Sequence, residues 1–120
     1  MFVKKLNSCS EFTANDGCRI RELLHPVKDG VELPFSLAIA RVEAGKSTYK
    51  HRLKQTEIYY ILNGTGRMYI DTETRDVEQG DVIAIPAQSI QFIENTGSET
   101  LEFAAIVSPP WNEADDIRLD

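Results

Sequence analysis

The chain has 120 residues, of which 42% are apolar and 27% charged, a composition typical of one soluble globular domain over residues 1–120. Its net charge of −6 and pI of about 4.9 argue against a nucleic-acid partner and an anionic membrane surface, because both require clustered Lys and Arg. No apolar run approaches the roughly 18 residues of a spanning helix, and none follows the N-terminal lysines as in a signal peptide. We therefore predict a cytoplasmic protein.

Short β-rich runs separated by turn residues follow one another along the chain, and no segment shows a long helical period. Asn63 and Gly64 form a hairpin signal, and further polar turns fall near 71–74 and 95–98. The pattern predicts an all-β sandwich or small barrel. The acidic C-terminal tail, residues 109–120, is expected to be a surface segment or a short helix. The predicted strands lie within residues 18–26, 36–45, 57–64, 66–80, 81–86 and 90–108.

Alternation along the strands places polar groups among apolar ones. His51 and Leu53 share one face of a strand, and a hairpin bend after the polar "KQT" brings Glu57 beside His51. Tyr59 continues the face of Glu57 and suits a barrel interior. The opposite face carries the apolar run of Ile58, Tyr60 and Leu62. A second sheet of the same chain could cover it, but we favour a partner subunit and predict a homodimer.

Two motifs of spaced glycine, proline and polar residues occupy segments 45–64 and 80–95. Their members are Gly45, His51, Glu57 and Gly64 in the first, and Gly80, Pro86 and Asn95 in the second. This spacing resembles the two motifs of the cupin family, and the resemblance spans just under half the chain. It implies a double-stranded β-helix, the jelly-roll barrel of that family, with a small-molecule site inside.

The departures from the family pattern fall on the implied metal ligands. The resemblance implies three histidines and one glutamate, but Leu53 and Gln91 stand where two of the histidines belong, and Gln88 replaces a motif glycine. The remaining metal set is His51, Glu57 and Gln91. Because Gln91 offers only a neutral amide oxygen and Leu53 no donor, we expect Zn²⁺, Ni²⁺, Fe²⁺ or Mn²⁺ to bind weakly or not at all.

Three interpretations of these residues stay open. His51 and Glu57 are a hydrogen-bonded pair in a metal-free polar pocket, or they hold a metal with Gln91, or they are structural remnants without a ligand. His25 is a further candidate for a missing nitrogen ligand, although it also fits a plain strand end.

The expected catalytic residues are Glu57 and His51 as proton carriers, with Tyr59 orienting the ligand. The expected ligand-binding residues are Gln91, Arg41 and Tyr69. Arg41 would bind a carboxylate or phosphate if it faced the cavity, whereas an outward side chain would be solvated. The two tyrosines also suit plain core or wall positions.

The family resemblance implies several functions rather than one. Small cupins similar to this chain resemble mannose-6-phosphate isomerase, which suggests an isomerase or epimerase acting on a sugar or sugar phosphate, assisted by a divalent metal or by acid–base chemistry. The alternative is a non-catalytic, metal-free ligand-binding or sensor cupin that kept the pocket and lost the metal.

Overall fold

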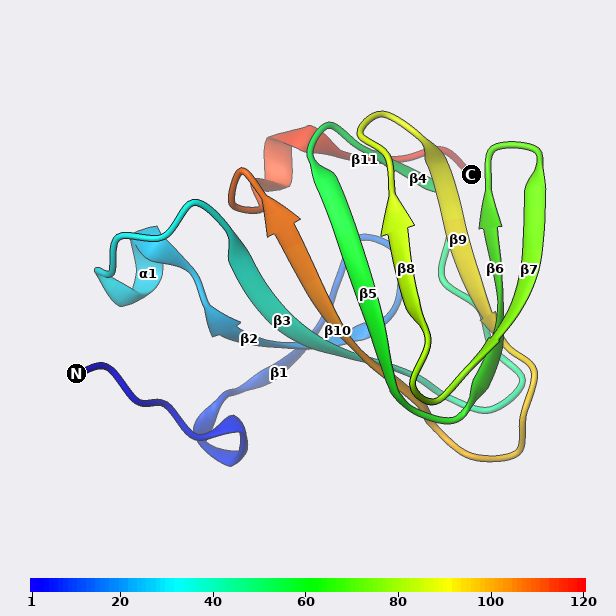
Figure 1. Ribbon diagram of the computed structural model, residues 1–120, viewed down its shortest axis with the longest axis horizontal. Helices are drawn as coiled ribbons and strands as arrows, with labels where there is room; N and C mark the ends of the chain where they lie inside the picture. Colours follow the sequence, from blue (N-terminus) through cyan, green and yellow to red (C-terminus); the bar gives the residue numbers. More distant parts are fainter.

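The computed structural model describes residues 1–120, and its strands form two antiparallel sheets that face each other (Figure 1). The first sheet has the order β1-β2-β3-β10-β5-β8 and the second the order β11-β4-β9-β6-β7. The strands are β1 (Glu11–Thr13), β2 (Arg19–Leu24), β3 (Ser36–Val42), β4 (His51–Leu53), β5 (Thr56–Asn63), β6 (Thr65–Ile70), β7 (Glu73–Glu78), β8 (Val82–Ile85), β9 (Ile90–Asn95), β10 (Leu101–Ser108) and β11 (Asp116–Arg118). The expected jelly-roll barrel is confirmed.

Three short helical turns complete the chain: η1 (Leu6–Ser8), α1 (Pro26–Asp29) and η2 (Glu113–Asp115). None of them has the length and apolar character needed to cross a membrane. Regular structure is otherwise all strand, as the alternating β-branched and aromatic residues predict.

The turn between β5 and β6 depends on Gly64. The two strands do not pair with each other, so this turn is not the hairpin that Asn63 and Gly64 indicate in the sequence. Its φ is +90°, a left-handed conformation that favours glycine, and a Cβ there would lie 2.9 Å from the backbone oxygen of Thr100. The turn lets β5 join the first sheet and β6 the second. Asn63 secures this crossing by donating from its side-chain amide to Thr100 O at 3.1 Å. The tight turn thus connects the strands that carry both halves of the core.

The hydrophobic core fills one part of the space between the sheets. Ile61, Ile93 and Leu101 are fully buried there, and the rings of Tyr59 and Phe103 lie 4.2 Å apart between their centroids. Each buried aliphatic or aromatic side chain of this kind stabilises the fold by about 1.5–3 kcal/mol. The rest of the interior is left to small and polar residues.

The C-terminal tail contributes more than the expected surface segment. Its η2 turn fits the predicted short helix, but residues 116–118 form β11, which pairs with β4 and places Asp116 opposite Leu53. Trp111 fastens the tail by donating its backbone N–H to Ser36 Oγ at 2.9 Å. In Figure 1 the tail runs beside β4 at one end of the barrel. The sequence did not indicate this strand, because three residues are too few to show alternation.

The outer face of the first sheet is exposed around β5 and β8. Tyr60 is 46% exposed, Leu62 37% and the neighbouring Val82 67%. A covering sheet within the chain, which was one expectation, is therefore wrong. The homodimer stays a prediction, which light scattering at working concentration would contradict by finding a monomer.

Candidate functional site

A cavity of about 320 Å³ lies along the inner face of the first sheet. Its floor comes from β2, β3, β5 and β10, and the segment after β1 and the C-terminal tail close its sides. Three alanines make the room: Ala38 and Ala105 lie directly opposite each other in register, and Ala40 follows on β3. Larger side chains at these positions would fill the space as they do elsewhere in the core.

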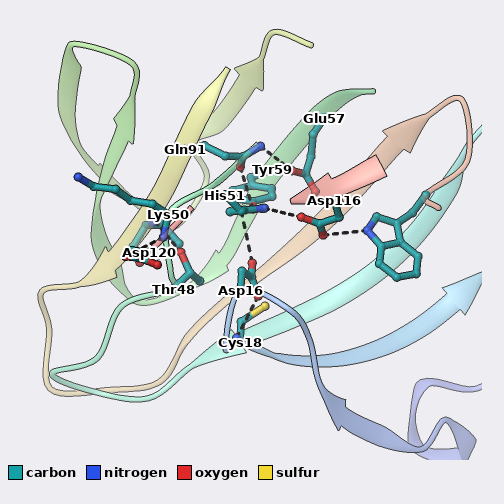
Figure 2. A network of polar contacts seen from close by, with 12 residues as sticks. Asp16, Cys18, Thr48, Lys50, His51, Glu57, Tyr59, Gln91, Asp116 and Asp120 are labelled. Atoms are coloured by element: carbon teal, nitrogen blue, oxygen red, sulfur yellow. Dashed lines mark hydrogen bonds and ion pairs between the residues drawn. The ribbon is translucent and has the colours of Figure 1, made fainter. Parts of the chain in front are cut away.

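One chain of hydrogen bonds joins two strands, β5 and β9, beside the cavity. The Tyr59 hydroxyl donates to Gln91 Oε1 at 3.3 Å, and Gln91 Nε2 donates to Glu57 Oε1 at 3.2 Å. Tyr59 and Glu57 lie on β5, and Gln91 lies on β9 directly opposite His51 of β4. The structure therefore brings together the expected metal set and all three expected catalytic residues (Figure 2).

A second chain of contacts runs through His51 from one end of the sequence to the other. His51 Nδ1 lies 2.9 Å from Asp116 Oδ1, and the other Asp116 oxygen accepts from Trp111 Nε1 at 3.1 Å. On the opposite side, His51 Nε2 lies 3.6 Å from Asp16 Oδ2. Figure 2 shows His51 between the two aspartates. The imidazole thus connects the segment after β1 with the C-terminal tail.

Burial and these neighbours shift the protonation of the site. Burial raises the pKa of Glu57 to about 8, and the attraction of His51 and the hydrogen bond from Gln91 only partly oppose it. For His51, burial acts to lower the pKa, but the bond to Asp116 and the charges of Asp16 and Asp116 outweigh it, so the pKa is raised. Burial, reinforced by the charge of Glu57, raises the pKa of Tyr59 well above its ordinary value. At neutral pH, Glu57 is therefore mostly a neutral acid.

Two expected ligand-binding residues lie outside the site. Arg41 sits on the outer face of β3 and pairs with Glu11, with Nη1 3.4 Å from Oε2. Tyr69 stacks on Phe92 with ring centroids 4.1 Å apart, on the outer face of the second sheet. Neither side chain lines the cavity, so the structure does not support the ligand-binding role expected for either residue.

His25 caps α1 instead of approaching the metal set. Its Nδ1 accepts from the backbone N–H of Val27 at 3.3 Å, and Nε2 lies 2.8 Å from Trp111 O. The suggested extra nitrogen ligand is therefore not at the site.

Sequence reasoning missed Asp16, Asp116 and Cys18 as members of the site. Asp16 caps its own turn by accepting from the Cys18 N–H at 3.0 Å, which leaves its second oxygen toward His51. Burial and the charge of Asp16 raise the pKa of the Cys18 thiol well above its ordinary value, so it stays protonated. The only signal for the aspartates was their acidity, which is common in turns and tails.

The donors present do not fit a metal ion of the kind the family resemblance implies. Leu53, only 2% exposed, fills one ligand position with hydrocarbon. The polar groups of Gln91 and Glu57 are bonded to each other, and His51 Nδ1 is bonded to Asp116. Of the imidazole nitrogens of His51, only Nε2 has no hydrogen-bond partner. No group of three His, Cys, Asp or Glu side chains is arranged to hold a metal ion. A single imidazole is too few ligands for a stable transition-metal site.

The structure explains why the family motif has a glycine at the position of Gln88. Gln88 adopts a φ of +70°, the left-handed region that glycine enters without strain. Its N–H donates to Leu53 O at 2.8 Å, which holds the turn before β9 against β4. The backbone of the motif is therefore kept although its usual residue is not.

Comparison with known proteins places this chain in a family. The family model of the cupin domain matches residues 38–107. An uncharacterized protein of Methanocaldococcus jannaschii is 42% identical over 105 residues, covering 87% of this chain and 83% of its own. A cupin 2 conserved barrel domain protein from Salinispora arenicola superposes with a TM-score of 0.76 at 23% identity, covering 95% of this chain and 91% of that one.

Two further matches come from Thermotoga maritima, one in sequence and one in structure. One, named an oxalate-binding protein, is 34% identical over 68 residues, covering 56% of each chain. A crystal structure of a predicted oxalate decarboxylase superposes with a TM-score of 0.78 at 23% identity, covering 90% of this chain and 99% of that one. Structural likeness at this identity concerns the fold alone.

Proposed function

The chain belongs to the cupin family, and we propose that it binds a small molecule in the barrel cavity without a resident metal ion. One observation carries the proposal: beside an open cavity of about 320 Å³, Gln91 and Glu57 are bonded to each other and His51 Nδ1 is bonded to Asp116, so these groups do not converge on a metal ion. That volume lies at the lower end of typical small-molecule pockets, about 300–1,000 Å³. Of the two functions expected from the sequence, this one is the metal-free ligand-binding cupin.

The lining supports a ligand-binding role over a purely structural one. Aromatic side chains of Phe12, Trp111 and Tyr59 reach the cavity together with the buried polar groups of His51 and Glu57. Apolar walls with a few convergent polar groups characterise small-molecule sites. An empty cavity lined by alanines costs stability, because the surrounding side chains lose packing contacts. A bound ligand would supply those contacts.

The proposal is tested with a pair of matched variants. Ala38→Leu places a larger side chain in the cavity, whereas Ala104→Leu makes the same change on the outer face of β10, opposite Ile39. We expect compounds from a small-molecule library, detected by saturation-transfer NMR, to bind the native chain and Ala104→Leu but at least about tenfold more weakly to Ala38→Leu.

Elemental analysis supplies the second half of the test. After dialysis against Zn²⁺, Ni²⁺, Fe²⁺ or Mn²⁺, we expect far less than one metal ion per chain. Stoichiometric metal that is lost in His51→Ala would contradict the metal-free form of the proposal. Binding that Ala38→Leu leaves unchanged would contradict the location of the site.

Acid–base isomerisation is a second candidate, and the pKa of Glu57 favours it. A carboxyl group with a pKa of about 8 is suited to give and retake a proton near neutral pH, and His51 beside it carries the opposite charge when protonated. This is the isomerase or epimerase expected from the sequence, without the metal.

Such proton transfer leaves an isotopic trace. If the candidate is right, a hydroxyaldehyde or hydroxyketone such as D-fructose, incubated in D₂O, will take up deuterium next to its carbonyl group. Glu57→Gln should reduce that uptake at least about 100-fold. Uptake that Glu57→Gln does not change would argue against this role.

A further inference from the structure

One buried polar atom on the cavity wall lacks a hydrogen-bond partner, and a carboxylate oxygen lies beside it. His51 Nε2 makes no hydrogen bond although the residue is only 3% exposed, and Asp16 Oδ2 lies 3.6 Å from it. Asp16 itself is 6% exposed, and both residues line the cavity. Leaving buried polar groups unpaired costs about 1–3 kcal/mol each, so the wall is incomplete without a ligand group or water.

The remaining atoms of the same network are already engaged. A carboxylate only accepts, so the imidazole must donate to Asp116 from Nδ1, and Asp116 accepts again from Trp111. The first oxygen of Asp16 accepts from the Cys18 N–H. The two aspartates on either side of His51 favour its protonated form, in which Nε2 also carries a proton. What faces the cavity is therefore one carboxylate oxygen, which accepts, beside one ring N–H, which donates. A hydroxyl group, which both donates and accepts, matches this pair.

The charges around the cavity disfavour an anion. Its ionisable carboxyl groups come from Asp16, Glu22, Glu57, Glu113 and Asp116, and no arginine lines it. Lys28 is held by Glu22 at 2.8 Å, and His51 lies between two aspartates. No lining cation is thus free to neutralise a carboxylate or phosphate, and burying an unpaired charge is costly.

We propose that the cavity takes an uncharged, polyhydroxylated small molecule, one hydroxyl of which donates to Asp16 Oδ2 and accepts from His51 Nε2. The proposal rests on the proposed ligand-binding function and names its ligand class. The aromatic side chains of Phe12, Tyr59 and Trp111 offer apolar surface to the carbon skeleton of such a ligand. Of the sugar and sugar phosphate expected from the sequence, the lining favours the uncharged sugar.

The test uses probes that share a carbon skeleton and differ in charge. Saturation-transfer NMR titrations would compare D-glucose, D-mannose, D-ribose and myo-inositol with the matching phosphate esters, and the two hexoses also with their uronates and their 2-amino derivatives. We expect at least one uncharged polyol to bind, and its phosphate, carboxylate and ammonium derivatives to bind at least about tenfold more weakly. The oxalate ion is expected not to bind.

A matched pair of variants assigns the effect to Asp16. Asp16→Asn keeps the shape but removes the carboxylate, and we expect binding of the uncharged probe to fall at least about tenfold. Asp76→Asn makes the same change on β7, where Asp76 faces solvent and pairs with Arg67, and should leave binding unchanged. Circular dichroism of Asp16→Asn, with Asp16→Glu as a second variant, separates loss of the site from loss of the fold.

The outcomes distinguish this proposal from the function on which it rests. Tighter binding of an anionic or ammonium probe than of the matched polyol would overturn the ligand class, as would unchanged binding in folded Asp16→Asn. If no polyol binds while other library compounds bind in a manner that Ala38→Leu abolishes, the ligand class is wrong and the cavity site stands. If no compound of any class binds, both are wrong.

Discussion

Glu57→Gln is expected to be several kcal/mol more stable than the native chain at pH 9 and equally stable near pH 4. The pKa of Glu57 is raised from 4.5 to about 8 by burial. A group whose pKa is higher in the folded than in the unfolded state stabilises the fold fully below the unfolded value. That stability is lost as pH rises through the folded value. The loss therefore falls between about pH 4.5 and pH 8.

The magnitude is large for a domain of this size. Each unit of pKa shift corresponds to about 1.4 kcal/mol, so the shift of Glu57 amounts to several kcal/mol. Domains of this kind have a total free energy of unfolding of about 5–15 kcal/mol. Glutamine matches the shape of a protonated glutamic acid, carries no charge at any pH and can still accept from Gln91. The variant should therefore keep the packing and lose the titration.

Urea unfolding followed by circular dichroism from pH 4 to pH 9 measures this effect. The pKa of His51 is also raised, so its titration also makes the fold less stable as pH rises, but only above the ordinary pKa of 6.5. The free energy of unfolding of the variant should therefore stay constant between pH 4.5 and 6.5, where that of the native chain already falls. Glu73→Gln, on the exposed strand β7, is the matched control. A native chain whose stability does not fall over this range would refute the buried, protonated Glu57.

The sequence predicted the barrel because its signals were both local and regular. Alternation marked the long strands, and the turn at Gly64 has a φ that only glycine adopts easily. The motifs also brought His51 and Gln91 together on paired strands, with Glu57 bonded to Gln91, because strand parity fixes which side chains share a face. These inferences depend on neighbours in sequence or on fixed spacings.

The rest of the site depends on contacts that no spacing encodes. Asp16 lies 35 positions before His51 in an irregular segment, and Asp116 lies 65 positions after it at the start of the three-residue strand β11. Arg41 and Tyr69 were wrongly placed in the site for a different reason. Arg41 sits in a strand with apolar residues on both faces, so parity could not say which face was inward, and Tyr69 is an aromatic residue that suits an inner or an outer face. Pairing register settles that question, and the sequence alone does not determine it.

Restoring the two missing histidines is expected to create a metal site. Leu53 shares the buried face of β4 with His51, and Gln91 lies opposite His51 and is bonded to Glu57. The double variant Leu53→His, Gln91→His should therefore place three imidazoles and one carboxylate around a common point. We expect its affinity for Zn²⁺ or Ni²⁺, measured by titration calorimetry, to exceed that of the native chain at least about 100-fold.

The contact between His51 and Asp116 favours this outcome. An imidazole that donates its Nδ1 proton to a carboxylate presents Nε2 as the ligand atom, and such outer contacts typically change metal affinity by about 10–100-fold. His51 Nε2 is already buried and without a hydrogen bond. The native chain thus keeps one oriented ligand nitrogen and lacks its companions.

Stability should report the same change with a second observable. Without metal, two imidazoles in a buried site lack partners, and we expect the variant to lose about 1–3 kcal/mol for each. Metal that binds only the folded state restores stability in proportion to the logarithm of its concentration. Its melting temperature should therefore rise with added Zn²⁺, whereas that of Leu62→His, a matched change on the outer face, should not. A folded double variant that binds no more Zn²⁺ than the native chain would mean that these four side chains do not meet at one point, and that the departures at Leu53 and Gln91 are not what keeps metal out.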